Sequence, residues 1–167
     1  MTELLSTRFP FAIGDLLPSP FAAEFVYASP QDCSLYSIDK GTTTRSIHIT
    51  DTSYIQTNPV SLQSSSNPLV YYLSHPDGIR ICDFRKKKSS VLTPAERCVF
   101  LERIDEDWNT LIACFEDEIN VIDIRNPKSL LLHWRYSGQI RKIECRRCPS
   151  EYNIHCLSRS DSIRMCV

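Results

Sequence analysis

One short block of sequence recurs along this chain about every forty residues, and it constrains the fold more than any other feature. Each copy contains an apolar residue of a strand-like segment, at spacings of 44, 40 and 44 residues: Leu35, Ile79, Ile119 and Ile163. An aspartate follows four residues after the first three: Asp39, Asp83 and Asp123. A period of about 40–45 residues built from short strands is typical of propeller repeats with four strands per blade. The period therefore predicts an all-β array of blades.

The strands between the turn signals predict how the repeats divide. We expect residues 1–23 to be a lead-in, or part of a strand that closes against another segment. Four repeats follow at about 24–58, 59–97, 98–139 and 140–167. The strand at 119–124 is apolar on both faces, as expected when neighbouring blades cover both sides of a sheet. The polar stretch 61–68 is interpreted as a loop, and residues 95–104 could also be written as a helix that begins with a capping box.

The chain stops in the third strand of its last repeat, which gives about three and a half to four blades. Closed propellers typically have about four to eight blades. We therefore expect an incomplete ring, or one completed by another polypeptide. The isolated chain is not expected to be a stable monomer, because an open array leaves strand edges exposed.

The composition of the chain limits the cellular compartment and the class of partner that we expect. The net charge of −1 offers no global field to recruit nucleic acid or a membrane. The N-terminus does not fit a signal peptide, and no apolar run is long enough to cross a bilayer. We expect an intracellular protein in which the eight cysteines are reduced thiols, several of them within apolar strand patterns.

The segments 69–83, 110–123 and 153–167 each combine an apolar pair of strands with a turn and a final strand that reads like I-x-[VI]-x-D. In this the chain resembles WD-repeat proteins over nearly everything after residue 24. The Gly-His and Trp-Asp dipeptides of that family are missing, so the histidine of its usual Asp-His-Ser/Thr-Trp network is not identifiable. The resemblance implies a divergent WD-like propeller that acts as a protein-interaction scaffold without a cofactor.

A narrower resemblance covers residues 123–134, which read DIRNPKSLLLHW. This segment is similar to the D-x-R-x-P-x-x-x-L-x-W pattern in the propeller subunit of the RNA polymerase I promoter-selectivity factor. That family acts with the TATA-binding protein in ribosomal transcription. The similarity implies a nuclear transcription-initiation subunit that contacts DNA through its basic loops.

Cysteine and histidine gather near the C-terminus, where Cys145 and Cys148 are followed by His155 and Cys156. A structural zinc site needs four such ligands, so a small zinc-stabilised binding domain around 145–156 is one alternative. Adjacent residues of a regular strand point to opposite faces, so His155 and Cys156 would not both bind one metal. Buried or loop thiols are the favoured interpretation, and we expect no metal.

Two basic clusters are the candidate contacts for a partner or for nucleic acid: Arg85, Lys86, Lys87 and Lys88, and then Arg146 and Arg147. The first could be a nuclear localisation element, and it favours a nuclear over a cytoplasmic location. The favoured interpretation of this run is, however, a solvated turn between the last two strands of a blade. The repeated D-x-R at Asp83 and at Asp123 predicts a carboxylate–guanidinium pair with a structural role.

Signatures of catalysis are missing from the sequence. It contains no G-x-S-x-G, H-E-x-x-H, Walker or G-x-G-x-x-G motif, and its four histidines are scattered. We therefore expect no enzyme and favour a scaffold whose rigid blades present variable loops to the other proteins of a larger complex. Contact with nucleic acid would be indirect.

Overall fold

The structure is a computed structural model that describes residues 13–21, 23–29, 31–49, 61–94, 98–104, 107–115, 117–135, 140–148, 151–158 and 162–166. Over the last three ranges, and at Pro94, it describes the backbone alone. All the regular structure in these ranges is β-strand. The all-β prediction is therefore confirmed.

The strands form four antiparallel sheets, which we call blades 1 to 4. Blade 1 consists of β1 (Asp15–Pro18), β2 (Glu24–Ala28), β3 (Asp32–Ser37) and β4 (Thr42–His48), and blade 2 of β5 (Leu62–Ser64), β6 (Val70–His75), β7 (Gly78–Asp83) and β8 (Lys88–Pro94). Blade 3 consists of β9 (Phe100–Arg103), β10 (Thr110–Cys114), β11 (Glu118–Asp123) and β12 (Leu130–Arg135), and blade 4 of β13 (Ile140–Cys148), β14 (Glu151–Ser158) and β15 (Ser162–Cys166). Within each blade, strands that follow one another in sequence are neighbours in the sheet.

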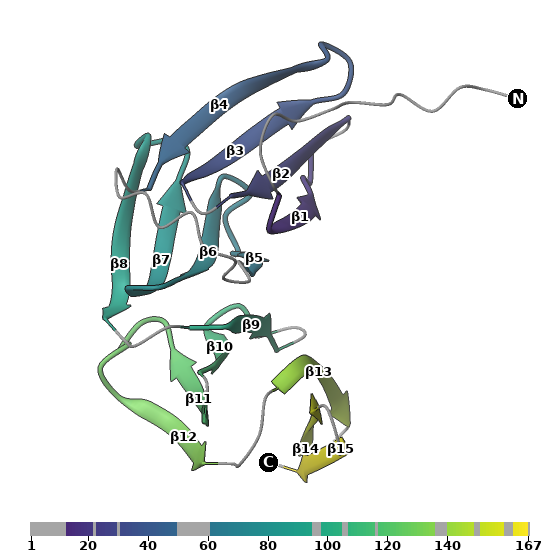
Figure 1. The fold of residues 1–167 in the computed structure, drawn as a ribbon, viewed down its shortest axis with the longest axis vertical. Helices are drawn as coiled ribbons and strands as arrows, with labels where there is room; N and C mark the ends of the chain where they lie inside the picture. Colours follow the sequence, from purple (N-terminus) through teal and green to yellow (C-terminus); the bar gives the residue numbers. More distant parts are fainter. Residues whose placement is uncertain are drawn as a thin grey trace, which may run out of the picture.

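The blades succeed one another along an arc, as Figure 1 shows. The first strand of each blade lies on the inner side, where β1 contacts β5, β5 contacts β9, and β9 contacts β13. The last strands, β4, β8 and β12, lie on the outer margin. The arc does not close into a ring, so the molecule is an open propeller segment.

Apolar side chains fill the space between neighbouring blades. Val26, Cys33 and Leu35 of blade 1 share one core cluster with Tyr71 and Phe84 of blade 2. The opposite face of blade 2 shares a second cluster with blade 3, through residues that include Ile79, Leu111 and Ile122. Both faces of blade 2 are therefore buried, which explains why its central strands read as apolar runs.

The inner strand β5 differs from the sequence-based expectation, because 61–68 was expected to be a loop. Asp15–Pro18 form β1, so the strand alternative holds for this part of the lead-in. Pro18 fits at the end of β1 because an edge strand tolerates a residue without an N–H donor. The helical alternative over 95–104 is wrong for Phe100–Arg103, which form β9.

The repeat aspartates are equivalent in two blades but not in the first. Asp83 pairs with Lys88 across a turn of four residues, and Ser37 pairs with Thr42 across a turn of the same length. Ser37 therefore holds the position that Asp83 holds, and the side chain of Ser37 accepts a hydrogen bond from the Lys40 N–H. Asp39 lies two residues later, exposed in the turn. The repeat in blade 1 is thus offset by two residues from the one predicted.

Candidate interaction surface

Each blade has two ends, and the loops at one end carry most of the lysines. The first and third connections of a blade lie together there, because the residue after the third strand donates its N–H to the carbonyl of the residue before the second strand. This bond joins Ile38 to Ala23 (2.7 Å), Phe84 to Leu69 (2.9 Å) and Ile124 to Asn109 (2.8 Å). We call the described residues of these connections the lysine rim: 19–21, 23, 38–41, 65–69, 84–87, 104, 107–109 and 124–129.

Five of the six lysines of the chain lie in or directly beside the third connections of the lysine rim: Lys40, Lys86, Lys87, Lys88 and Lys128. All five are exposed. Arg85 and the run that follows it were expected to form a solvated turn between the last two strands of a blade. The exposure of these lysines fits that interpretation and leaves their ammonium groups accessible to a partner.

The arginines of the same turns are already paired. Arg85 donates to both carboxylate oxygens of Asp83, from Nε at 2.9 Å and from Nη2 at 2.8 Å. Arg125 binds Asp123 in the same way, with Nη2 at 2.6 Å from Oδ2. Hydrogen bonds from these arginines lower the pKa of Asp83 and of Asp123 to about 2. The predicted Asp–Arg pairs are confirmed, and each closes a turn.

Leucines replace threonines at one position of the outer strands. The strand register makes Leu130 and Leu131 of β12 equivalent to Thr43 and Thr44 of β4, and a β-bulge occurs at this point in both blades. Thr44 donates its hydroxyl hydrogen to the Leu35 carbonyl of its own blade, at 3.3 Å. Leu130 and Leu131 are instead 45% and 53% exposed. Blade 3 thus presents apolar side chains to solvent where blade 1 presents hydroxyls.

The opposite ends of the blades carry histidines paired with polar side chains. His48 lies 2.9 Å from Asp32 in blade 1, and His133 lies 2.7 Å from the Asn120 side-chain oxygen in blade 3. In blade 2, His75 contacts Asp77 in the tight turn after β6. We call this end the histidine rim; it includes the described residues of the second connections, 29, 31, 76–77, 115 and 117.

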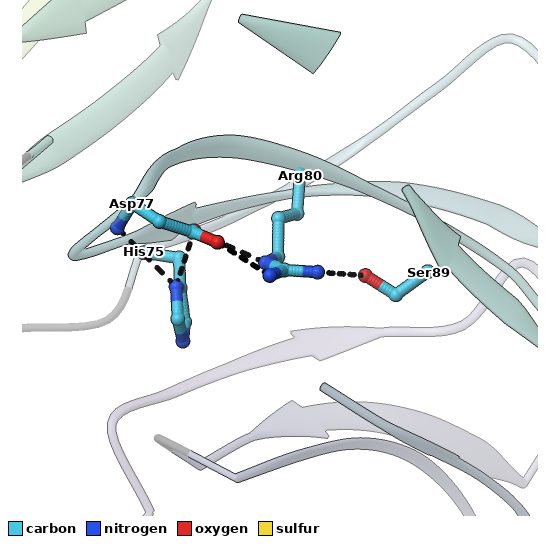
Figure 2. Close-up of polar contacts among 4 residues, drawn as sticks. All are labelled: His75, Asp77, Arg80 and Ser89. Carbon is cyan, nitrogen blue, oxygen red and sulfur yellow. Dashed lines mark hydrogen bonds and ion pairs between the residues drawn. The ribbon is translucent and has the colours of Figure 1, made fainter. Parts of the chain in front are cut away.

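The network around Asp77 is the most extended polar cluster of the described residues, and Figure 2 shows its members. Asp77 accepts hydrogen bonds from Arg80, and Arg80 also donates to the Ser89 hydroxyl at 3.2 Å. Burial opposes ionisation of Asp77, but the bonds from Arg80 and His75 outweigh it and lower its pKa. The cluster joins β6, β7 and β8, so we interpret it as a brace of blade 2.

Four cysteines are buried free thiols: Cys33, Cys82, Cys98 and Cys114. Burial raises the pKa of Cys98 to about 12. A hydrogen bond between Cys33 and Cys82 raises the pKa of the Cys33 thiol and lowers that of Cys82, so these thiols touch across the interface of blades 1 and 2. None of the four is placed for chemistry with a substrate, because all lie inside the blade cores.

The predicted zinc ligands and the second basic cluster lie in blade 4. Cys145, Cys148, Arg146 and Arg147 belong to β13, and His155 and Cys156 belong to β14. Their side chains are outside the described residues, so the zinc alternative stays a prediction. Where side chains are described, no three of the metal-binding types gather. The described part of the chain contains no helix that could span a membrane.

Sequence reasoning missed several features of this surface. The sequence predicts a strand over Leu130 and Leu131, but its apolar pattern does not show that these side chains face solvent. Val91 in β8, 44% exposed, was missed for the same reason. For Trp108 the sequence leaves two interpretations, packing within a blade or an exposed contact, and the structure places it exposed on the lysine rim, with the Arg103 guanidinium 3.8 Å from its ring centroid. Aligning the sequence of β12 with that of the polar strand β4 could have shown that the two leucines occupy exposed positions.

Comparisons with known proteins support the fold. No protein-family model matches the chain, and no curated protein sequence matches it. Among solved structures, the chain is similar to the WD40 β-propeller domain of Doa1, with a TM-score of 0.70 and 16% sequence identity. The match covers 93% of this chain and 51% of that one, so the chain spans about half of the matched structure. Nothing in these comparisons supports the narrower resemblance to the polymerase I factor. The chain has a WD40-like propeller fold.

Proposed function

We propose that this chain is a non-catalytic protein-interaction scaffold within a multiprotein assembly. WD40-like propellers generally serve as such scaffolds, and catalysis is not typical of them. The observation that supports the proposal most is the outer margin of blades 2 and 3, where rigid sheets present lysines beside exposed aliphatic side chains. Contiguous exposed apolar groups with a polar rim mark interaction sites, and the adjacent Leu130 and Leu131 are both exposed here.

The test is reconstitution of a complex rather than detection of contacts in an extract. The tagged chain, expressed at its natural level, should migrate in a native extract well above the mass of a monomer. Proteins that co-migrate with it should bind the purified chain when they are purified in turn. A chain that migrates alone in every extract, and that binds none of the co-purified proteins, would contradict the proposal.

A more specific form of the proposal is a nuclear transcription-initiation subunit. The exposure of Lys86, Lys87 and Lys88 supports it, because an accessible lysine run suits both nuclear import and contact with phosphates. Replacing all three with alanine should reduce nuclear accumulation of the chain. The free energy of unfolding should stay within about 0.5 kcal/mol, as for most exposed substitutions. Unchanged accumulation in the nucleus would contradict this form while leaving the scaffold proposal in place.

A further inference from the structure

We propose that the outer margin of blades 2 and 3 is the docking site for an extended acidic segment of a protein partner, one that also carries aliphatic side chains. This inference rests on the proposed scaffold function and names the chemistry of the partner. The site, which we call the docking strip, consists of exposed lysines and exposed aliphatic residues: Lys86, Lys87, Lys88, Val91, Lys128, Leu130 and Leu131.

The docking strip is continuous from one blade to the next. It begins at the turn before β8 and follows this strand to Thr93, whose hydroxyl donates to the Pro127 carbonyl of blade 3 at 3.1 Å. Lys128 comes directly after Pro127, and the two leucines begin β12. Figure 1 shows β8 and β12 succeeding each other along the outer margin. An extended partner segment, at about 3.3 Å per strand residue, could follow the strip along β8 and onto the start of β12.

The charge of the docking strip selects an acidic partner. Its four lysines have no ion pair with a carboxylate among the described residues. The acids of the two turns, Asp83 and Asp123, are already occupied by Arg85 and Arg125. Asp107, in the connection between β9 and β10, interacts with Arg125 rather than with a lysine of the strip. The four lysines therefore remain the unpaired charges of the docking strip.

The backbone at Lys87 supports a role for this lysine. Lys87 has a positive φ of 50°, and Gly41 holds the equivalent position of the turn in blade 1 with φ 62°. A left-handed conformation is unfavourable for a residue with a Cβ, and glycine avoids the cost. Blade 2 thus carries a lysine where the same turn in blade 1 has glycine. Such a residue is a candidate for function.

The aliphatic residues favour a polypeptide over a nucleic acid. Single-stranded nucleic acids bind proteins through aromatic stacking and phosphate contacts, and Val91, Leu130 and Leu131 offer no ring for stacking. The guanidinium groups of Arg85 and Arg125 could otherwise form bidentate hydrogen bonds with phosphates, but they already bind carboxylates. Lysines on an outer strand can also serve to prevent aggregation between edges. Leucines exposed beside them work against that purpose and fit an apolar contact instead.

Titration of a labelled peptide against the full chain tests the inference. The probe is a ten-residue fluorescent peptide of alternating glutamate and leucine, followed by anisotropy at protein concentrations below those at which the chain associates. Binding should weaken at least tenfold for Lys86→Glu/Lys87→Glu/Lys88→Glu and should fall as salt rises. Leu130→Thr/Leu131→Thr should weaken it at least fivefold. This second variant should fold, because β4 carries Thr43 and Thr44 at the same positions.

Matched controls decide between the explanations. Lys40→Glu reverses the charge of a single lysine in the corresponding turn of blade 1 and should alter binding less than twofold. A peptide with serine for leucine, and one with lysine for glutamate, should both bind at least tenfold more weakly. Equal binding by the wild-type chain and both strip variants would overturn the inference, as would tighter binding of a ten-nucleotide single strand than of the acidic peptide.

Failure of this inference can be distinguished from failure of the scaffold proposal. If purified partners bind the chain and the strip variants equally well, the chain is a scaffold that uses another surface, and the inference is wrong. If association of the chain with itself changes in Leu130→Thr/Leu131→Thr while peptide binding does not, the occupant is a second copy, which also overturns it. Loss of both peptide and partner binding in the two variants supports the inference.

Discussion

Asp83 shows how a single side chain closes a blade turn. Its carboxylate accepts two hydrogen bonds from the Arg85 guanidinium and a third from the Arg85 backbone N–H at 3.0 Å. Asp123 makes the same three contacts with Arg125. The two turns therefore need the ionised carboxylate, and the arginine is held against its own strand end.

The pH dependence of stability should report this pair. The pKa of Asp83 in the folded chain is about 2, below its ordinary value of about 3.9. Its ionised form thus stabilises the fold above pH about 4, and this contribution is lost as pH falls through about 2. We predict that the melting temperature of Asp83→Asn lies below that of the wild type at pH 5, and that the difference shrinks toward pH 2.

Arg85→Gln removes the partner instead and should reproduce the same loss, because a neutral amide cannot hold the carboxylate in its ionised form as strongly. Melting curves followed by far-ultraviolet circular dichroism between pH 2 and pH 5 would measure both variants. A difference between wild type and Asp83→Asn that stays constant over this range would show that ionisation of Asp83 does not stabilise the turn.

Lys87 provides a second prediction for a single residue. Because its φ is positive, Lys87→Gly should raise the free energy of unfolding by about 0.5 kcal/mol. The relief of left-handed strain stabilises the fold, and the greater freedom of glycine in the unfolded chain offsets part of this gain. Lys86→Gly, at a neighbouring position without positive φ, should lower it. Urea titration of the two variants measures both. If both were destabilised alike, the left-handed strain at Lys87 would be negligible.

At the scale of strands, burial of both faces of a sheet is the main source of stability. Val121 lies in β11 on the face opposite Ile122, and both are buried. The expectation that Val121 is buried is thus confirmed. Val121→Asp would place an unpaired carboxylate in this position, and we predict a loss of about 3 kcal/mol in the free energy of unfolding.

The control for this prediction lies in the same blade. Ser129→Asp adds the same charge at an exposed position in the turn before β12, and it should change the free energy of unfolding by less than about 0.5 kcal/mol. Chemical denaturation of the two variants separates the effect of burial from that of charge. Equal stability of Val121→Asp and the wild type would contradict the packing of blade 3.

The central strands of each blade could be predicted from the sequence. The inner and outer strands could be predicted less well than the central ones. Strands such as β6, β10 and β11 are buried on both sides, so selection for apolar residues leaves a clear signal. The inner strand β5 has three residues and a polar composition, and β1 ends at a proline. Such segments are held in place by neighbouring strands rather than by their own propensity.

The candidate surface could be predicted in part. The lysine run stands out in the sequence because charges cluster there, and its place in a turn follows from the strands on both sides. The exposure of Leu130 and Leu131 depends on the β-bulge in β12 and on the lack of a further strand beside it among the described residues. Neither is visible in a sequence that reads simply as an apolar strand. The equivalence of these leucines to Thr43 and Thr44 appears only when the registers of two blades are compared.

At the scale of the whole molecule, the blades depend on their neighbours. Blade 2 packs against a blade on each side, and its core is shared with both. The described part of blade 4 has three strands, and β15 pairs only with β14. Stability in such an array is close to a sum of blade terms and interface terms, so the terminal blades are held by one interface where the central blades have two.

An open arc presents unpaired strand edges that a closed ring would cover, and such edges invite pairing with other chains. We therefore predict that the 167-residue chain associates as its concentration rises. Sedimentation velocity over a hundredfold range of concentration should show a sedimentation coefficient that increases with concentration. A single monomeric boundary at every concentration, with cooperative unfolding, would contradict the prediction and show that the ends of the arc are satisfied within one chain.

The source of the association can be identified with the variants already described. If it arises at the ends of the arc, Leu130→Thr/Leu131→Thr should associate as strongly as the wild type, because β12 lies in blade 3, away from the edge of β15. Association through the docking strip would instead be weakened in this variant and would fall as salt rises, because the strip combines apolar and positively charged groups. If the variant associates as strongly as the wild type, the docking strip stays available to a different protein while the ends of the arc are paired. A scaffold that joins several proteins needs both surfaces at once.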